Sequence, residues 1–92
     1  MNKVKDNLEV AVFTTKYVLE GKSPILYVYH YDDGSWQFNG KERNINDEDY
    51  RIISLSEIVE LDTTIQGILD LPLGFEAFRE TRDKSWQIIS AN

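Results

Sequence analysis

The chain contains no cysteine, so it can form no disulfide and offers no thiolate for catalysis or zinc binding. It also has no apolar run close to the roughly 20 residues that span a bilayer. The opening MNKVKDNLEV carries two lysines but is not followed by the apolar segment of a secretory signal. We therefore expect a cytoplasmic protein that associates with no membrane.

Basic residues are scarce: ten lysines and arginines stand against sixteen acidic residues, for a net charge of −6. Nucleic-acid binding needs a basic face that neutralises phosphates, so this balance argues against a nucleic-acid partner. An acidic surface would instead steer the protein toward a basic partner. Solubility alone also explains the charge, and on composition we favour that interpretation.

Length and composition are those of an ordinary globular protein, with 92 residues, 41% of them hydrophobic and 28% charged. A chain of this length buries about 60 to 65% of its unfolded surface and supports one core. We expect a single α+β domain over residues 1–92, in which residues 1–7 form a flexible N-terminus.

Strand patterns dominate the first half of the chain. LEVAVFT (8–14) alternates with a period of two, and ILYVYHY (25–31) is dense in β-branched and aromatic residues. A further short strand is predicted at RIIS (51–54). The intervening TKYVLEGKSP is typical of a turn or one short helical turn.

A hairpin is predicted where DDGSWQF follows the 25–31 strand. Asp33-Gly34 suits a two-residue type I′ turn, and that turn would pair Tyr31 with Trp36. This register gathers the aromatic residues on one face of the hairpin: Tyr27, Tyr29, Tyr31, Trp36 and Phe38. Such a face is core if helices cover it and a recognition surface if they do not. We expect core, because large exposed apolar patches are uncommon in monomers.

Two capping-box patterns predict short helices in the second half. Ser54 with Glu57 opens the first helix, and Thr63 with Gln66 opens the second. Pro72 ends this region, because proline cannot continue a helix. The residues expected to face inward are Leu55, Ile58, Val59, Ile65, Ile68 and Leu69.

The tripeptide Ser-Trp-Gln occurs twice, each time after a charged turn and at the start of a return strand. The second copy belongs to a closing hairpin with strands over 75–80 and 85–89. A four-residue loop there places Arg79 opposite Trp86 and predicts a cation–π contact between them. Hairpin formation alone explains the repeat, since the flanking sequences do not match.

His30 is the only histidine. One hypothesis makes it a general base held by Asp32 or Asp33. However, no serine, cysteine or threonine is placed near it by the sequence, and Asp33 belongs to the turn. We interpret His30 as a structural residue of its strand.

Acidic residues gather in the hairpin turn and in NGKERNINDEDY (39–50), which we interpret as a solvated loop. A calcium loop of EF-hand type needs glycine at its sixth position and glutamate at its twelfth. Counting from Asn44, these positions hold Asp49 and Leu55, so we expect no metal and no cofactor. The acids are candidate contacts for a protein partner: Asp32, Asp33, Glu42, Asp47, Glu48 and Asp49.

Two motifs carry a resemblance to a protein family. They are DGSWQF (33–38) and DLPLG (70–74), the latter followed by Ala77 and Arg79. With the order of elements over residues 10–88, they resemble a family of small bacterial proteins of unassigned activity, some of which occur as immunity proteins in polymorphic toxin systems. The resemblance implies an α+β domain that binds a protein and performs no catalysis. An immunity protein would use its acidic surface to find and occlude a basic toxin site.

Taken together, these patterns predict an antiparallel sheet of about five strands with two short helices packed on one face. The predicted function is that of a non-catalytic protein-interaction domain, an immunity protein that binds and occludes a toxin. The alternative is a small-ligand-binding module or an enzyme using His30 and nearby carboxylates. We expect a monomer or a weak homodimer, which would pair a sheet edge at RIIS or at the strand beginning with Leu8.

Overall fold

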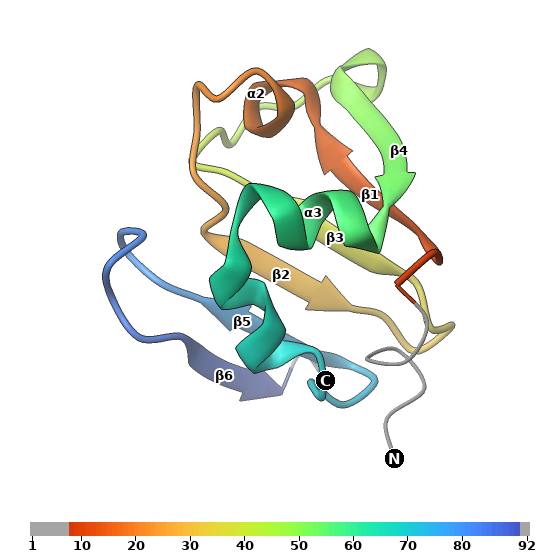
Figure 1. Cartoon of the computed structure of the whole chain (residues 1–92), viewed down its shortest axis with the longest axis vertical. Coiled ribbons are helices and arrows are strands. Elements are labelled where there is room, and N and C mark those ends of the chain that lie inside the picture. The colour runs from red at the N-terminus through yellow and green to blue at the C-terminus, as the bar shows by residue number, and fades with distance from the viewer. Residues whose placement is uncertain (1–7, 91–92) are drawn as a thin grey trace.

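A six-stranded mixed sheet forms the centre of the molecule (Figure 1). The structure is a computed structural model that describes residues 8–90, so the flexible N-terminus expected for residues 1–7 lies outside the described residues. The strands are β1 (Ala11–Thr15), β2 (Tyr27–His30), β3 (Trp36–Asn39), β4 (Tyr50–Ser54), β5 (Phe75–Phe78) and β6 (Gln87–Ser90). Across the sheet their order is β4-β1-β3-β2-β5-β6.

Short helical segments connect the strands: α2 (Lys16–Leu19), η1 (Asp47–Asp49), α3 (Leu55–Leu61) and η2 (Thr63–Ile68). In Figure 1, α3 and η2 lie in front of one face of the sheet, and the residues predicted to face inward from them are all buried. Ser54 caps α3 as predicted, because its hydroxyl accepts from Glu57 N at 3.2 Å. The cap of η2 is Asp62 rather than the predicted Thr63.

No helix in the described part of the chain is long and apolar enough to cross a membrane.

These elements define the α+β class, as predicted from the sequence. The sheet differs from the prediction in having six strands rather than about five and in being mixed rather than antiparallel. The parallel pair is β1 with β3, in which Phe13 lies opposite Gln37. It arises because β3 inserts between β1 and β2. This order depends on packing between distant segments, which local sequence patterns do not encode.

At the tip of the β2–β3 hairpin, three residues, 32–34, separate the hydrogen-bonded Tyr31 and Ser35, rather than the predicted two. Tyr31 N donates to Ser35 O, and Gly34 N donates to Tyr31 O, each at 2.9 Å. Gly34 has a φ of 91°, which glycine adopts without steric cost. Asp33 Oδ1 accepts from Ser35 N at 2.9 Å. A three-residue loop with glycine in the left-handed region is a common alternative to the two-residue turn.

This loop shifts the hairpin by one residue from the predicted register. His30 lies opposite Trp36, where Tyr31 was expected. Neighbouring residues of a strand point to opposite faces of the sheet. A one-residue shift in the pairing therefore moves the side chains of one strand to the other face relative to those of its partner strand. Trp36 and Phe38 therefore join the buried core, whereas the tyrosines of β2 lie on the opposite face of the sheet.

The closing hairpin has the predicted pairing, with β5 antiparallel to β6. The guanidinium carbon of Arg79 lies 4.1 Å from the centre of the Trp86 ring, which confirms the expected cation–π contact. Arg79 is buried and forms an ion pair with Asp62, while its Nε and Nη2 donate to Ile25 O. These contacts join β5 to the start of η2 and to the segment that leads into β2.

Candidate functional site

The face of the sheet opposite α3 and η2, which we call the open face, displays large apolar side chains. One row of side chains crosses all six strands in register: Ile52, Phe13, Gln37, Tyr29, Glu76 and Ile89. Phe13 is 39% exposed and Ile52 is 65% exposed. Because apolar surface in water is unfavourable, an uncovered face of this kind marks a candidate binding surface.

Tyr29 of β2 and Tyr31, which directly follows that strand, give the open face its chemical character. The rings of Tyr29 and Tyr31 stack with centroids 6.0 Å apart, and Tyr31 Oη donates to Gln37 Oε1 at 3.2 Å. Burial, followed by the nearby Glu76 carboxylate, raises the pKa of Tyr29. Burial, followed by Tyr50 and Glu76, raises the pKa of Tyr31. The phenols therefore stay protonated and neutral at physiological pH.

Two hollows lie on this face where the segment between β3 and β4 meets the sheet. The first, the Tyr31 hollow, has a volume of about 290 Å³ and is lined by Phe13, Tyr31, Ser35, Gln37, Asp47 and Tyr50. The second, the Glu42 hollow, has a volume of about 350 Å³ and is lined by Tyr27, Tyr29, Asn39, Glu42, Arg43, Ile45 and Tyr50. Tyr50 contributes to both hollows, which are therefore neighbours.

The predicted acidic contacts divide between this surface and other positions. Asp47 and Glu42 each line one of the two hollows, and Asp33 is near enough to Tyr31 to help raise its pKa, after burial, Tyr50 and Glu76. Asp33 is itself bonded to Ser35 through Oδ1. Among the six predicted contacts, the carboxylates that form no hydrogen bond or ion pair with any described residue are those of Asp32, Glu42, Asp47 and Glu48.

Asp49 is a buried structural residue, and the interpretation of its segment as a solvated loop is wrong at this position. It is 3% exposed, its carboxylate accepts from Tyr17 Oη at 3.1 Å and from Asn46 N at 3.2 Å, and it lies 3.3 Å from Lys16 Nζ. Burial opposes ionisation, but these three donors outweigh it and hold the pKa of Asp49 below its usual value. The carboxylate thus joins η1 to α2 and is not available to a partner.

His30 is also buried, at 8% exposure. Its Nδ1 lies 2.7 Å from Leu71 O, to which it donates, and its ring stacks on Trp36. The hydrogen-bond partner of this nitrogen is therefore a backbone carbonyl rather than Asp32 or Asp33.

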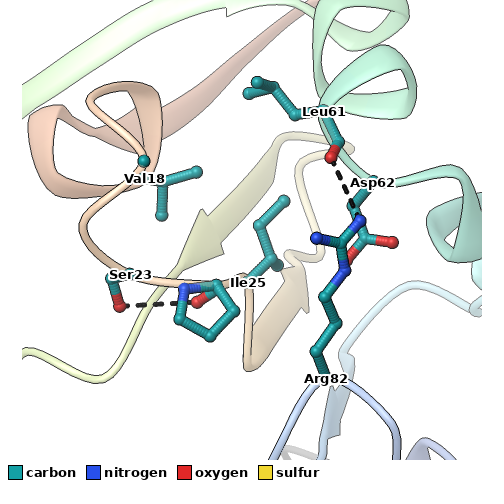
Figure 2. A pocket seen from close by; sticks show the side chains of 8 residues that line it. Val18, Ser23, Ile25, Leu61, Asp62 and Arg82 are labelled. Carbon is teal, nitrogen blue, oxygen red and sulfur yellow. Dashed lines mark hydrogen bonds and ion pairs between the residues drawn. The ribbon is translucent and has the colours of Figure 1, made fainter.

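A third hollow, of about 240 Å³, lies between the α2 turn and the end of α3 (Figure 2). Figure 2 shows Arg82 extending across it toward Leu61 and Asp62. Arg82 Nη2 donates to Leu61 O at 3.5 Å, and Asp62 is already paired with Arg79. Arg82 Nε also lies 3.9 Å from Asp62 Oδ2, so both charged groups of this hollow already have partners within the protein. Within residues 8–90, no group of three or more histidine or acidic side chains is arranged to hold a metal ion.

The sequence prediction for the aromatic residues of the open face is core, with a recognition surface as the alternative. It places Tyr27, Tyr29 and Tyr31 in the core because the predicted register sets them beside Trp36. The signal was nevertheless present, since DDG fits a three-residue loop as well as a two-residue turn. The positions of Glu76 and Tyr50 depend on the pairing of β5 with β2 and of β4 with β1, which joins distant segments and was not predictable from the loop.

Comparison of the chain with protein-family models, with curated proteins and with solved structures finds no match. The family resemblance carried by the DGSWQF and DLPLG motifs therefore remains a prediction.

Proposed function

We propose that the protein is a non-catalytic interaction domain that binds a basic protein through the open face. The observation that supports this most directly is the combination of exposed aromatic side chains with carboxylates that have no partner among residues 8–90. Aromatic rings provide much of the contact energy at the centre of protein interfaces. Unpaired carboxylates beside them would pair with lysine and arginine side chains and would raise the association rate.

The finer proposal is that the protein is an immunity protein that occludes the basic site of a toxin. Inhibition by occlusion requires a stable surface rather than reacting groups, and a six-stranded sheet holds its side chains on a hydrogen-bonded backbone. The net charge of −6 suits a basic target. The alternative of a ligand module or enzyme centred on His30 has less support, because that side chain is buried and bonded to Leu71.

Affinity capture from a lysate of the host, with mass spectrometry as the readout, tests the proposal. The variant Asp47→Asn/Glu76→Gln removes two charges from the open face. The control variant Glu60→Gln/Asp70→Asn removes two exposed charges elsewhere, from α3 and the segment after η2. We expect the wild type and the control to capture the same basic protein in stoichiometric amount. The open-face variant should bind that purified protein at least tenfold more weakly at low salt.

Co-expression then separates an immunity protein from a general binding domain. The captured protein is expected to stop growth when it is expressed alone and to become harmless when the wild-type chain is co-expressed. An acidic partner, or a partner that binds the open-face variant and the control equally well, would contradict the proposal. A harmless partner would contradict only the immunity function.

A further inference from the structure

The Tyr31 hollow combines aromatic rings from separate strands with one carboxylate. Phe13 comes from β1, Tyr50 from β4 and Tyr31 from the residue after β2, while Asp47 reaches the hollow from η1. Phe13 and Tyr31 are 39% and 41% exposed, so both rings are accessible from solvent. The volume of about 290 Å³ accommodates the end of one long side chain.

Within the described part of the chain, no basic side chain balances the charge of this hollow. No basic residue lines it, and the Asp47 carboxylate forms no hydrogen bond or ion pair within residues 8–90. The phenol of Tyr31 stays neutral, because burial and the neighbouring Tyr50 and Glu76 raise its pKa. The hollow thus presents ring faces and one negative charge, both of which attract a cation.

The same protein contains a filled site of this composition. Arg79 lies over the Trp86 ring at 4.1 Å, pairs with the Asp62 carboxylate and donates to Thr64 Oγ1 at 3.0 Å. A ring, a carboxylate and a hydroxyl hold one guanidinium group there, together with the backbone carbonyls of Ile25 and Arg82. The Tyr31 hollow offers the corresponding groups through its rings, Asp47 and the Ser35 hydroxyl, and no cation of the described chain fills it.

We propose that the Tyr31 hollow receives an arginine side chain of the partner protein, with its guanidinium stacked on a ring and hydrogen-bonded to Asp47. This inference rests on the proposed function and adds the side chain that is recognised. Arginine is preferred to lysine because its planar guanidinium stacks on aromatic rings and donates in the same plane, whereas an ammonium group is a compact, strongly hydrated charge. The neighbouring Glu42 hollow is less suited to a cation, because Arg43 lines it.

The test is an NMR titration of the isotope-labelled protein with the peptide acetyl-Gly-Arg-Gly-amide. Two matched peptides replace arginine by citrulline, which keeps the shape and lacks the charge, or by lysine. We expect the arginine peptide to shift the aromatic resonances of Phe13, Tyr31 and Tyr50. The citrulline peptide should bind about tenfold more weakly, since a charge-assisted hydrogen bond is lost. The affinity of the lysine peptide should lie between those of the other two peptides.

Variants connect the binding to the named groups. Asp47→Asn should weaken binding of the arginine peptide about tenfold and leave binding of the citrulline peptide unchanged, because only the charged pair is removed. Tyr31→Leu, which keeps an apolar side chain, should weaken binding of both peptides. Glu60→Gln on α3 serves as the control and should change the affinity for neither peptide. Amide spectra of each variant establish that the fold is retained.

Several outcomes would overturn the inference: equal binding of the arginine and citrulline peptides, no effect of Asp47→Asn, shifts confined to other surfaces, or no shifts at tens of millimolar peptide. Its failure is distinguishable from failure of the proposed function. A basic partner whose binding survives Asp47→Asn and is not displaced by the arginine peptide would contradict the hollow as the contact while supporting the interaction domain. Arginine binding in a protein that captures no basic partner would contradict the proposed function alone.

Discussion

His30 stacks directly on Trp36 across the β2–β3 hairpin, with ring centroids 3.9 Å apart and planes 12° from parallel. The same histidine donates from Nδ1 to Leu71 O at 2.7 Å, so it joins the hairpin to the segment that follows η2. Both contacts require His30 on the core side of β2. They therefore help to keep Tyr29 and Tyr31 on the open face.

Replacing His30 with alanine is expected to lower the free energy of unfolding by about 2 to 4 kcal/mol, because a buried ring and its hydrogen bond are lost. Urea denaturation followed by tryptophan fluorescence measures this change. Asp32→Ala, in the exposed loop nearby, should change stability by less than about 0.5 kcal/mol. Equal midpoints for wild type and His30→Ala would show that the stacked pair does not hold the hairpin.

Contacts between residues that are close in the chain could be predicted from the sequence, whereas contacts between distant segments could not. Ser54 and Glu57 are close in the chain, and their capping geometry was predictable. The Arg79 contact with Trp86 follows from one hairpin and was also predictable. The parallel pairing of β1 with β3 depends on distant segments and was not.

The candidate site was less predictable than the fold, because a shift of one residue in the hairpin register decides which side chains lie on the open face. With a two-residue turn, Tyr31 would lie beside Trp36; with the observed three-residue loop, it lies on the opposite face. Both loops suit the sequence DDG, and the choice is set by which rings the helices bury. Of the acidic residues, Asp47 could be placed on the surface from its polar surroundings, but the burial of Asp49 required knowledge of Lys16 and Tyr17.

Asp62→Asn is expected to destabilise the protein by about 3 to 5 kcal/mol, because it leaves the buried Arg79 guanidinium without its counter-charge. The measurement is chemical denaturation at neutral pH. A double-mutant cycle with Arg79→Met isolates the pairwise energy. Glu80→Gln, an exposed substitution in the same segment, is the control and should have little effect. Additive single changes in the cycle would indicate that the two side chains act independently.

Gly40→Ala is expected to cost about 1 to 3 kcal/mol, because a small-to-large change in a packed position strains its neighbours. A Cβ at Gly40 would lie 2.0 Å from Ser23 Oγ and 2.6 Å from Ser23 Cβ. At Gly67 in η2, such a Cβ would meet no atom within 4 Å other than those of its adjacent residues and the local helix backbone, so Gly67→Ala should leave stability unchanged or raise it by about 0.4 to 1 kcal/mol. Thermal denaturation of the two variants compares them directly. Equal losses would contradict the packing argument.

The acid limb of the stability curve is expected to depend on Asp49 and Asp62. The donors around both carboxylates outweigh burial and hold their pKa values below the usual value in the folded state. Their contribution to stability is therefore complete above the unfolded pKa of about 3.9 and is lost as the pH falls through the lower folded values. Denaturation midpoints measured from neutral pH down to about pH 2 should show this loss.

Substitutions at Lys16 and Asp49 distinguish the loss of stability at acid pH from the loss of stability at alkaline pH. The hydrogen bond to Asp49, followed by the attraction of its charge, raises the pKa of Lys16. The contribution of Lys16 is thus complete below its unfolded pKa and is lost as the pH rises through the raised folded value. Lys16→Met should reduce the alkaline loss without removing it, because the raised pKa values of Tyr17, Tyr29 and Tyr31 also contribute to it. It should keep part of the acid loss, because Tyr17 Oη and Asn46 N still donate to Asp49. Asp49→Asn should weaken both limbs, and an unchanged acid limb in that variant would contradict the assignment of Asp49 as a buried, ionised structural group.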